Sequence, residues 1–211
     1  MQKKIALISS LVILLVSGAV TILTISSYNE RVMEEVDRRL HNGRDAVEQY
    51  LLTRSKAAYD LALFLARRST QAQDIVLGNK DRLVIVPEME EWKKILGGDY
   101  FEIDSNAGKS LIQTDDFFIT NRDVSSDALY EIAAQADKSK PSFGIEVYKD
   151  TLLLAGAAPI YTWEYFTTGV IKAGFFLTQE DMARIEQDTG FAVDIVLPSG
   201  KQFTTFPGGK I

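Results

Sequence analysis

The sequence of 211 residues predicts an α+β protein, in which an N-terminal transmembrane helix continues into a long helix and is followed by a five-stranded antiparallel sheet with flanking helices. An uncharged run opens the chain, and apolar residues then recur at helical spacing from 28 to 68. Five short segments with strand character follow, separated by turn residues. Strands that return on themselves, with the helices kept to one side, form such a domain.

The uncharged run from Ile5 to Ile25 is long enough to cross a bilayer as a helix, which takes about 20 apolar residues. Two lysines precede it, and positive residues stay in the cytoplasm. We therefore expect a single span in the inner membrane, with the residues after Ser26 extracytoplasmic, in the periplasm. A cleaved signal peptide is the alternative, because Ser17 and Ala19 form a small-x-small pair. Both alternatives export the rest of the chain.

The segment from 28 to about 68 contains no proline and carries one apolar stripe at helical spacing. The stripe comprises Tyr28, Val32, Val36, Leu40, Val47, Tyr50, Leu51, Ala58, Leu61 and Leu65. Charges of both signs cover the other faces, which suits them to water. A helix of this length needs a partner for its stripe, and that partner is either the following domain or a second copy of the chain in a homodimer.

The next elements are predicted from the residues at their boundaries. A second helix begins at Pro87, because proline suits the first turn, and it stops at the glycine pair 97–98. Residues 99–116 read as a strand, a turn at 105–108 and a second strand. This hairpin is the first half of the expected sheet.

One more helix and three strands complete the predicted sheet. The helix covers 125–137 and is capped by one of its two leading serines, Ser125 or Ser126. Strands at 142–149 and 151–163 meet in a tight Lys149-Asp150 turn. A third strand covers 167–178 after a looser connection.

The C-terminal part begins with a helix that Thr178 caps and Gly190 ends. Residues 191–205 then repeat the strand-turn-strand pattern of 99–116, with a Gly-Lys pair leaving the turn each time. Either a second module of the same kind begins near Phe191, or this is the closing hairpin of a single domain. We keep both alternatives open.

The stretch "GIEVYKDTLLLAGAAPIYTWEYFTTGVIKAGFFLTQEDMARIEQDTGFAVDI", about half of the chain, resembles the PAS-like Cache superfamily of extracytoplasmic sensors. The closest likeness is to the CHASE-type sensor domains of bacterial transmembrane receptors. A strand reaches Pro159-Ile160, a variable loop follows, an apolar strand runs from Gly169 to Leu177, and a helix ends in Thr189-Gly190. The Trp- and Asp-rich motif of one CHASE class and the Tyr-Arg-Trp-Tyr cluster of amino-acid-binding Cache domains are missing, so the resemblance carries no ligand class.

The resemblance implies the ligand-sensing region of a receptor whose output is a histidine kinase, a chemotaxis methyl-acceptor or a cyclic-dinucleotide enzyme. Binding of a small molecule would then move the long helix of a homodimer. We expect a cytoplasmic stub and membrane helix over 1–27, a long helix and helical connector over 28–96, a PAS-like module over 97–178, and a helix and hairpin over 179–211. The alternative is a membrane-anchored exported binding or scaffold module without a cytoplasmic output domain.

Five residues are candidates for the ligand site of such a sheet. Tyr148, Tyr161 and Trp163 belong to the central strands, and Arg122 and Lys149 lie nearby. An arginine can bind a carboxylate with two hydrogen bonds, and an aromatic ring can stack on a ligand or close over it.

Catalysis, metal binding and nucleic-acid binding find little support in the composition. The chain has 23 Lys+Arg against 29 Asp+Glu, a net charge of −6, and no basic block to neutralise phosphates. It contains no cysteine, and its only histidine, His41, has no neighbouring ligand pair. Asp104, Asp115 and Asp116 could offer oxygens to Ca²⁺ or Mg²⁺, but their spacing matches no calcium loop and favours solvated carboxylates. We expect no catalytic residue, cofactor or metal in this segment.

Overall fold

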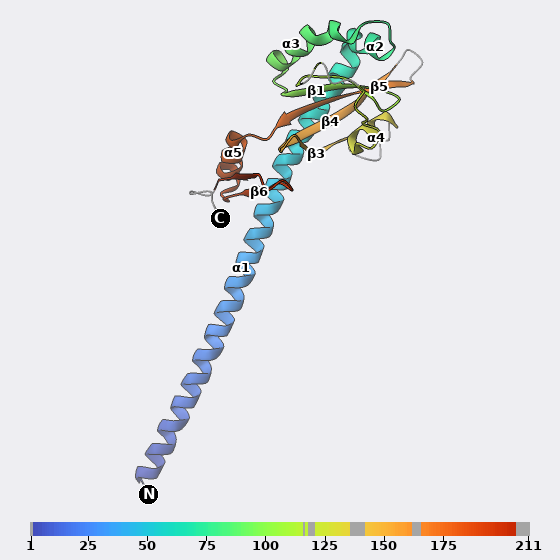
Figure 1. Cartoon of the computed structure of the whole chain (residues 1–211). Coiled ribbons are helices and arrows are strands. Elements are labelled where there is room, and N and C mark those ends of the chain that lie inside the picture. Colours follow the sequence, from blue (N-terminus) through green and yellow to red (C-terminus); the bar gives the residue numbers. More distant parts are fainter. Residues whose placement is uncertain (1, 116, 118–120, 136–141, 162–165, 206–211) are drawn as a thin grey trace. The chain divides into compact units, whose positions relative to one another are not determined.

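The computed structural model of the protein describes residues 2–115, 117, 121–135, 142–161 and 166–205 (Figure 1). Helix α1 runs from Gln2 to Arg68, which confirms the predicted long helix over 28–68. The chain divides inside this helix into two compact units, Met1–Ala46 and Val47–Ile211. Each unit is described by itself below.

The first unit is the N-terminal part of α1. The side chains of the expected membrane span lie outside the described residues, so the span stays a prediction. Among the helices that the structure does describe, none has an apolar stretch of the length that a bilayer crossing needs. The stripe residues Tyr28, Val32, Val36 and Leu40 are 40–68% exposed. In the single chain, this half of the apolar stripe is therefore uncovered.

A five-stranded antiparallel sheet forms the centre of the second unit (Figure 1). Its strands are β1 Tyr100–Ser105, β2 Ser110–Gln113, β3 Phe143–Tyr148, β4 Thr151–Tyr161 and β5 Thr167–Phe176, in the order β2-β1-β5-β4-β3. All five predicted strands are thereby confirmed. Lys149 and Asp150 both have positive φ angles, 44° and 60°, as a two-residue hairpin turn between twisted strands requires.

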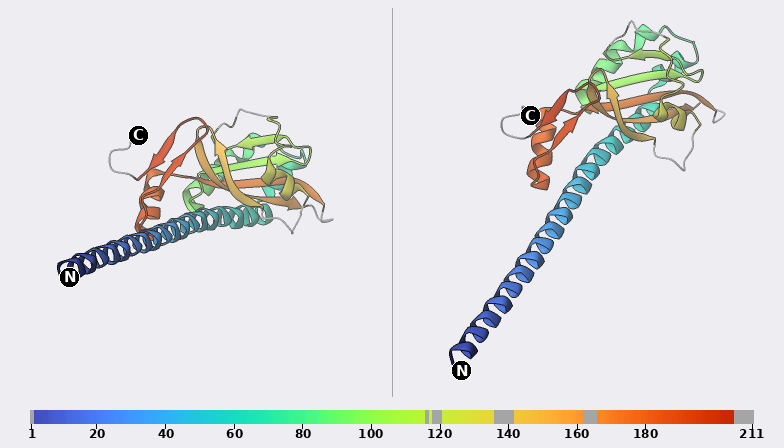
Figure 2. Two further views of the ribbon diagram at one scale, coloured as in Figure 1. Left: turned by 90° about the horizontal axis from the view of Figure 1, so that it is seen from below. Right: turned by 60° about the horizontal axis from the view of Figure 1, so that its bottom comes forward.

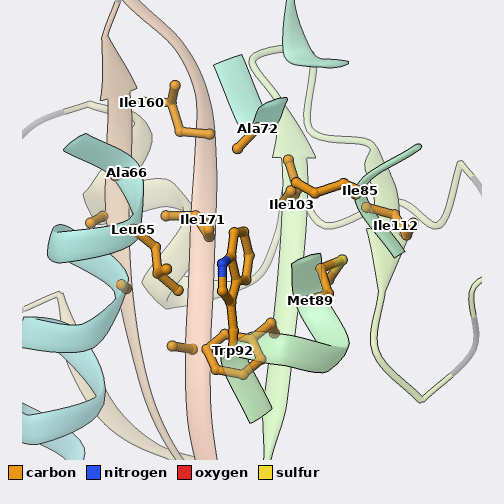
Figure 3. Close-up of a cluster of buried hydrophobic side chains, with 14 of the residues drawn as sticks. Leu65, Ala66, Ala72, Ile85, Met89, Trp92, Ile103, Ile112, Ile160 and Ile171 are labelled. Carbon is orange, nitrogen blue, oxygen red and sulfur yellow. The ribbon is translucent and has the colours of Figure 1, made fainter. Parts of the chain in front are cut away.

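One face of the sheet is covered by α1, α2 (Thr70–Val76), the 3₁₀ helix η1 (Arg82–Ile85) and α3 (Val86–Leu96). Figure 3 shows Trp92 of α3 at the centre of this layer, beside Leu65 of α1 and Ile171 of β5. The Trp92 ring meets Phe101 edge-on, with 5.6 Å between the ring centroids. Pro87 lies in the first turn of α3 and Gly97 ends the helix in the left-handed conformation, as predicted.

Helix α1 approaches the sheet closely because small residues line the contact. Ala58 and Ala62 are fully buried on α1, and Gly156 lies opposite on β4. A Cβ atom on Gly156 would stand 2.2 Å from the backbone nitrogen of Tyr59. Only glycine therefore fits there, and it lets the backbone of α1 lie directly on the sheet.

The opposite face is covered by α4 (Ala128–Ala134), which packs Leu129, Tyr130 and Ala133 on the sheet. The expectation that the helices stay on one side is therefore wrong. The strands bury apolar side chains in both directions, since Leu153 and Val170 face α4 while Ile171 faces α1. Each face consequently needs a cover.

The expected cap of α4 is also wrong. The N-cap residue is Asp127, and its side chain makes no capping hydrogen bond. Ser125 lies before the cap, and its hydroxyl donates a hydrogen bond to Asp123 Oδ1 at 2.6 Å. A short local hydrogen bond thus holds the serine in the loop that precedes α4.

The C-terminal part of the second unit contains α5 (Gln179–Thr189) and a separate hairpin of β6 (Asp194–Val196) and β7 (Gln202–Thr204), which lie next to each other in both views of Figure 2. Thr178 and Asp181 form a reciprocal capping box at the start of α5, and Gly190 ends it, as predicted. The hairpin and α5 share an apolar cluster with Leu51 of α1. Whether a second module begins near Phe191 stays a prediction.

Candidate functional site

Strand alternation places charged residues on the α4 face of the sheet. Along β1, Phe101 and Ile103 belong to the apolar cluster under α1, so Tyr100, Glu102 and Asp104 point the other way. Glu102 pairs in register with Lys172 of β5. Glu102 and Asp104 are fully buried and Lys172 is 2% exposed, so three ionisable groups lie inside the domain.

A cavity of about 300 Å³ opens beside Lys172, between the start of α4 and the strands. It is lined by Tyr100, Arg122, Asp127, Ala128, Glu146, Val147, Tyr148, Leu153 and Lys172. This volume is at the lower end of the range for small-molecule sites. Five charged residues meet here, namely Glu102, Arg122, Asp127, Glu146 and Lys172, and we call them the charged cluster.

Glu102 is the most heavily bonded member of the charged cluster. It accepts hydrogen bonds from Arg122 Nη2 at 2.8 and 3.1 Å, from Ser110 Oγ at 2.6 Å and from the Tyr100 hydroxyl at 2.7 Å. Burial alone would raise the pKa of Glu102, but Lys172, Arg122 and Ser110 outweigh it and the pKa falls below its usual value. Glu102 is therefore a stable buried carboxylate.

Lys172 bridges two further carboxylates. Its Nζ lies 3.1 Å from Glu146 Oε2 and 3.5 Å from Asp127 Oδ2. Arg122 Nη2 also lies 3.6 Å from Asp127 Oδ2. Burial alone would lower the pKa of Lys172, but Glu146 and the neighbouring carboxylates raise it, so the lysine keeps its charge.

Asp104 differs from Glu102 on this face, because neither of its oxygens has a hydrogen-bond partner among the residues that the structure describes. Complete burial, together with the nearby charge of Glu102, raises its pKa well above the usual value for an aspartate. Lys172, Arg122 and Asp127 are close enough to influence that pKa as well. A buried polar group without a partner is rare in folded proteins and calls for a ligand, a water or a proton.

Aromatic rings form the wall of the cavity near β3. The ring centroids of Tyr100 and Tyr148 are 4.9 Å apart, and Phe176 lies 6.2 and 6.1 Å from them. The Tyr148 hydroxyl donates to Asp115 Oδ2 at 2.7 Å, and burial together with that carboxylate raises the pKa of Tyr148 to about 12. The phenol is therefore neutral near physiological pH.

The structure brings only some of the predicted site residues together. Arg122 and Tyr148 line the cavity. Lys149 lies at the β3–β4 turn, where its Nζ is 2.7 Å from Asp115 Oδ2. Tyr161 is at the opposite end of β4 from the cavity residue Leu153, and Trp163 lies outside the described residues. Ligand binding by these residues stays a prediction.

Sequence reasoning missed the acids and the lysine of the charged cluster. The available signal was a charged residue in the middle of an apolar strand, Glu102 in "YFEIDS" and Lys172 in "TTGVIKAGFF". Such a residue is rarely buried unless it is paired. The partner itself could not be identified, because Glu102 and Lys172 meet only through a strand register that joins distant segments.

A second, larger cavity of about 610 Å³ lies between α1, η1 and α3. It is lined by Phe64, Leu65, Arg68, Ser69, Gln71, Val84, Pro87, Glu88, Glu91, Trp92, Ile95 and Leu96. Despite its size it is the weaker candidate, because buried charged groups with shifted pKa values converge on the smaller cavity instead. In the part of the chain that the structure describes, no three acids or histidines are grouped to hold a metal ion, and Asp116 lies outside that part.

Comparisons with known proteins give structural matches only. No protein-family model and no curated protein matches the chain. The ligand-binding domain of the Campylobacter jejuni chemoreceptor Tlp3 with L-valine is 14% identical, covers 85% of this chain and 73% of that chain, and has a TM-score of 0.49. The Vibrio cholerae LuxQ periplasmic domain is 11% identical and covers 81% and 80%, with a TM-score of 0.49.

A third match is the ligand-binding domain of the Pseudomonas aeruginosa amino acid chemoreceptor PctC in complex with GABA, at 17% identity, with 79% and 72% covered and a TM-score of 0.44. Periplasmic sensor domains of this kind are what the sequence resemblance predicts. These matches do not show the CHASE type, which stays a prediction. At such low identities and TM-scores, they assign neither a ligand nor an activity to this chain.

Proposed function

We propose that residues 47–211 form the extracytoplasmic ligand-sensing domain of a bacterial transmembrane receptor, and that a small molecule binds in the cavity beside α4. The observation that carries the proposal is the charged cluster, because four of its five members, Arg122, Asp127, Glu146 and Lys172, line this cavity. Buried ion pairs contribute little to stability once desolvation is counted. Their arrangement around an open cavity is therefore better explained by recognition of a polar ligand.

Binding in the cavity would act on two elements of the domain, the helix α4 and the strand β3. Asp127 is the N-cap residue of α4, and Glu146 belongs to the edge strand β3, so a ligand that changes their ion pairs with Lys172 would change how α4 and β3 pack. β3 pairs with β4, and β4 contacts α1 at Gly156. The ligand shifts the balance between two packings only by its different affinity for each.

The rest of the proposed receptor rests on the sequence pattern and on the resemblance to bacterial sensor domains. The proposal includes a single membrane span at Ile5–Ile25, a homodimer through α1, and an output domain of the histidine kinase, chemotaxis or cyclic-dinucleotide type beyond this segment. In this arrangement the domain itself binds and does not catalyse. The shift at the sheet would reach the membrane along α1.

The test is ligand-induced stabilisation of the full chain in detergent micelles. A panel of amino acids, organic acids, amines and divalent ions is screened by thermal unfolding, since a ligand that binds only the folded state raises the melting temperature by mass action. The variant Ala128→Leu narrows the mouth of the cavity without breaking an ion pair, because Ala128 is exposed at the start of α4.

We expect Ala128→Leu to remove the stabilisation by the ligand while the melting temperature of the free protein stays the same. The matched control is Ala57→Leu, the same change at an exposed position of α1. If no compound in the panel stabilises the protein, or if Ala128→Leu binds the ligand as well as the control does, the cavity is not the ligand site.

A further inference from the structure

Strand β3 forms one edge of the five-stranded sheet. It pairs with β4 in continuous register, and among the residues that the structure describes no strand pairs with its other side. Natural edge strands are commonly protected by a lysine, a proline or a bulge, because unpaired backbone groups bind further strands. The sequence of β3, FGIEVY, contains neither lysine nor proline. In the described part of the chain, this edge therefore lacks the usual protection.

The hydrogen bonds between β3 and β4 determine which backbone groups face outward. The N–H of Ala157 donates to the carbonyl of Ser142 at 2.8 Å. Bonded and non-bonded pairs alternate in an antiparallel ladder, so Ser142 and every second residue after it bond to β4. The residues between them, Phe143, Ile145 and Val147, therefore turn their N–H and C=O groups away from β4.

The side chains of these three residues make the same edge apolar. The ring of Phe143 lies against Tyr59 of α1, with 6.2 Å between the ring centroids. Because side chains alternate along a strand, Ile145 and Val147 lie on the α1 side of the sheet as well. They are 43% and 56% exposed. Outward backbone groups and uncovered hydrocarbon lie together on this edge, and strand addition uses this combination.

A second copy of β3 matches this edge in one antiparallel register. When Ile145 lies opposite its own copy, Phe143 lies opposite the partner's Val147, so all three outward residues pair with outward residues. A shift by two residues in one direction leaves Val147 without a partner inside β3. A shift in the other direction places Glu146 opposite Glu146, and like charges opposite each other are destabilising. In the matching register, Glu146 lies opposite Gly144 instead.

We propose that β3 is a docking surface for β3 of a second copy of this chain, so that the two sheets join into one antiparallel sheet. The two strands are related by a twofold axis at Ile145, and each chain supplies the same surface. This contact goes beyond the proposed function, because it depends neither on what binds in the cavity nor on the pairing of α1. Glu146 also lines the cavity, and the partner's Gly144 adds no side chain beside it.

Ile145→Cys tests the contact in the full chain in membranes. The natural chain contains no cysteine. Residues opposite each other in a bonded pair have Cα atoms about 5.5 Å apart, which suits a disulfide. We expect Ile145→Cys to form a disulfide-linked dimer under mild oxidation several-fold faster than the matched control Val196→Cys. Val196 is also an apolar strand residue, 57% exposed, but it belongs to the separate hairpin.

Val147→Cys tests the register. The two copies of residue 147 lie four positions apart along the paired strands, or about 13 Å, which is too far for a disulfide. Val147 is more exposed than Ile145, so random collision would favour cross-linking at 147, whereas the proposed contact favours 145. A mixture of Phe143→Cys and Val147→Cys chains should form the mixed disulfide, because these two positions lie opposite each other.

Non-reducing gel electrophoresis measures all four variants. Faster cross-linking at 145 than at 147 and 196, together with the mixed 143–147 disulfide, supports the contact. Cross-linking at 145 that is absent, or no faster than at 147 or 196, overturns it. The melting temperature of reduced Ile145→Cys should stay close to that of the natural chain, since this side chain is partly exposed. If that variant does not fold, absence of the mixed disulfide overturns the contact.

Discussion

At the scale of single residues, Asp104 is unusual, because its carboxyl group is buried and has no hydrogen-bond partner in the described part of the chain. The raised pKa of Asp104 means that the folded state holds a proton that the unfolded chain releases once the pH exceeds the ordinary aspartate value. Between these two pKa values the free energy of unfolding falls as the pH rises. The pKa of Glu102 is lowered, so its contribution has the opposite sign and is lost towards acid pH.

We predict that Asp104→Asn removes the loss of unfolding free energy that Asp104 causes as the pH rises. The contribution of Glu102 to the free energy of unfolding should stay the same. The stability of the variant relative to the natural chain should rise with pH above the ordinary aspartate pKa, by up to about 1.4 kcal/mol per pH unit. Urea unfolding of both proteins across the acid-to-neutral range measures this difference. A difference that stays constant with pH would mean that Asp104 is ionised in the folded protein.

At the scale of elements, the backbone of α1 lies directly on β4. This contact exists because Gly156 offers no side chain where Tyr59 passes. Overpacking of a tight contact costs about 1–3 kcal/mol, and here the obstacle is backbone that cannot rotate away. The contact is also the step through which the sheet is proposed to act on α1.

Gly156→Ala should therefore destabilise the domain by at least about 1–3 kcal/mol. Gly144→Ala is the matched control, because Gly144 lies in β3 and nothing stands within 4 Å of its Cβ position. Chemical unfolding of the two variants checks the difference. Equal stabilities would show that α1 does not lie directly on β4.

Much of the element order could be predicted from sequence, because it depends on local chemistry. Pro87 starts a helix, Lys149-Asp150 forms a turn, and Thr178 caps α5 wherever the rest of the chain lies. The face of the sheet that a helix covers depends instead on contacts between segments far apart in the sequence. For this reason the sequence pattern did not predict that α4 covers the opposite face from α1. The charged cluster could not be predicted for the same reason, since Glu102 and Lys172 become neighbours only when β1 pairs with β5.

At the scale of the whole molecule, the apolar stripe of the first unit is what a partner chain would cover. Tyr28, Val32, Val36 and Leu40 are exposed and follow helical spacing, which suits a pair of parallel helices. The chain contains no cysteine, so a single introduced cysteine reports contact without background.

We predict that Val36→Cys forms a disulfide-linked dimer in membranes under mild oxidation, because a disulfide requires the two Cα atoms to lie within about 7 Å. Glu34→Cys, which is also exposed but points away from the stripe, should cross-link much less. Non-reducing gel electrophoresis compares the two variants. Equal cross-linking at both positions would mean random collision instead of a helix pair.

The pairing of β1 with β5 also has a consequence for folding. Side chains alternate between the two faces of a strand, so a slip of β1 by one residue would turn Glu102 and Asp104 into the apolar layer under α1 and α3. Carboxylates placed there would meet only hydrocarbon. The burial of Glu102 and Asp104 on the α4 face therefore favours the native alignment of β1 with β5 over one shifted by a single residue.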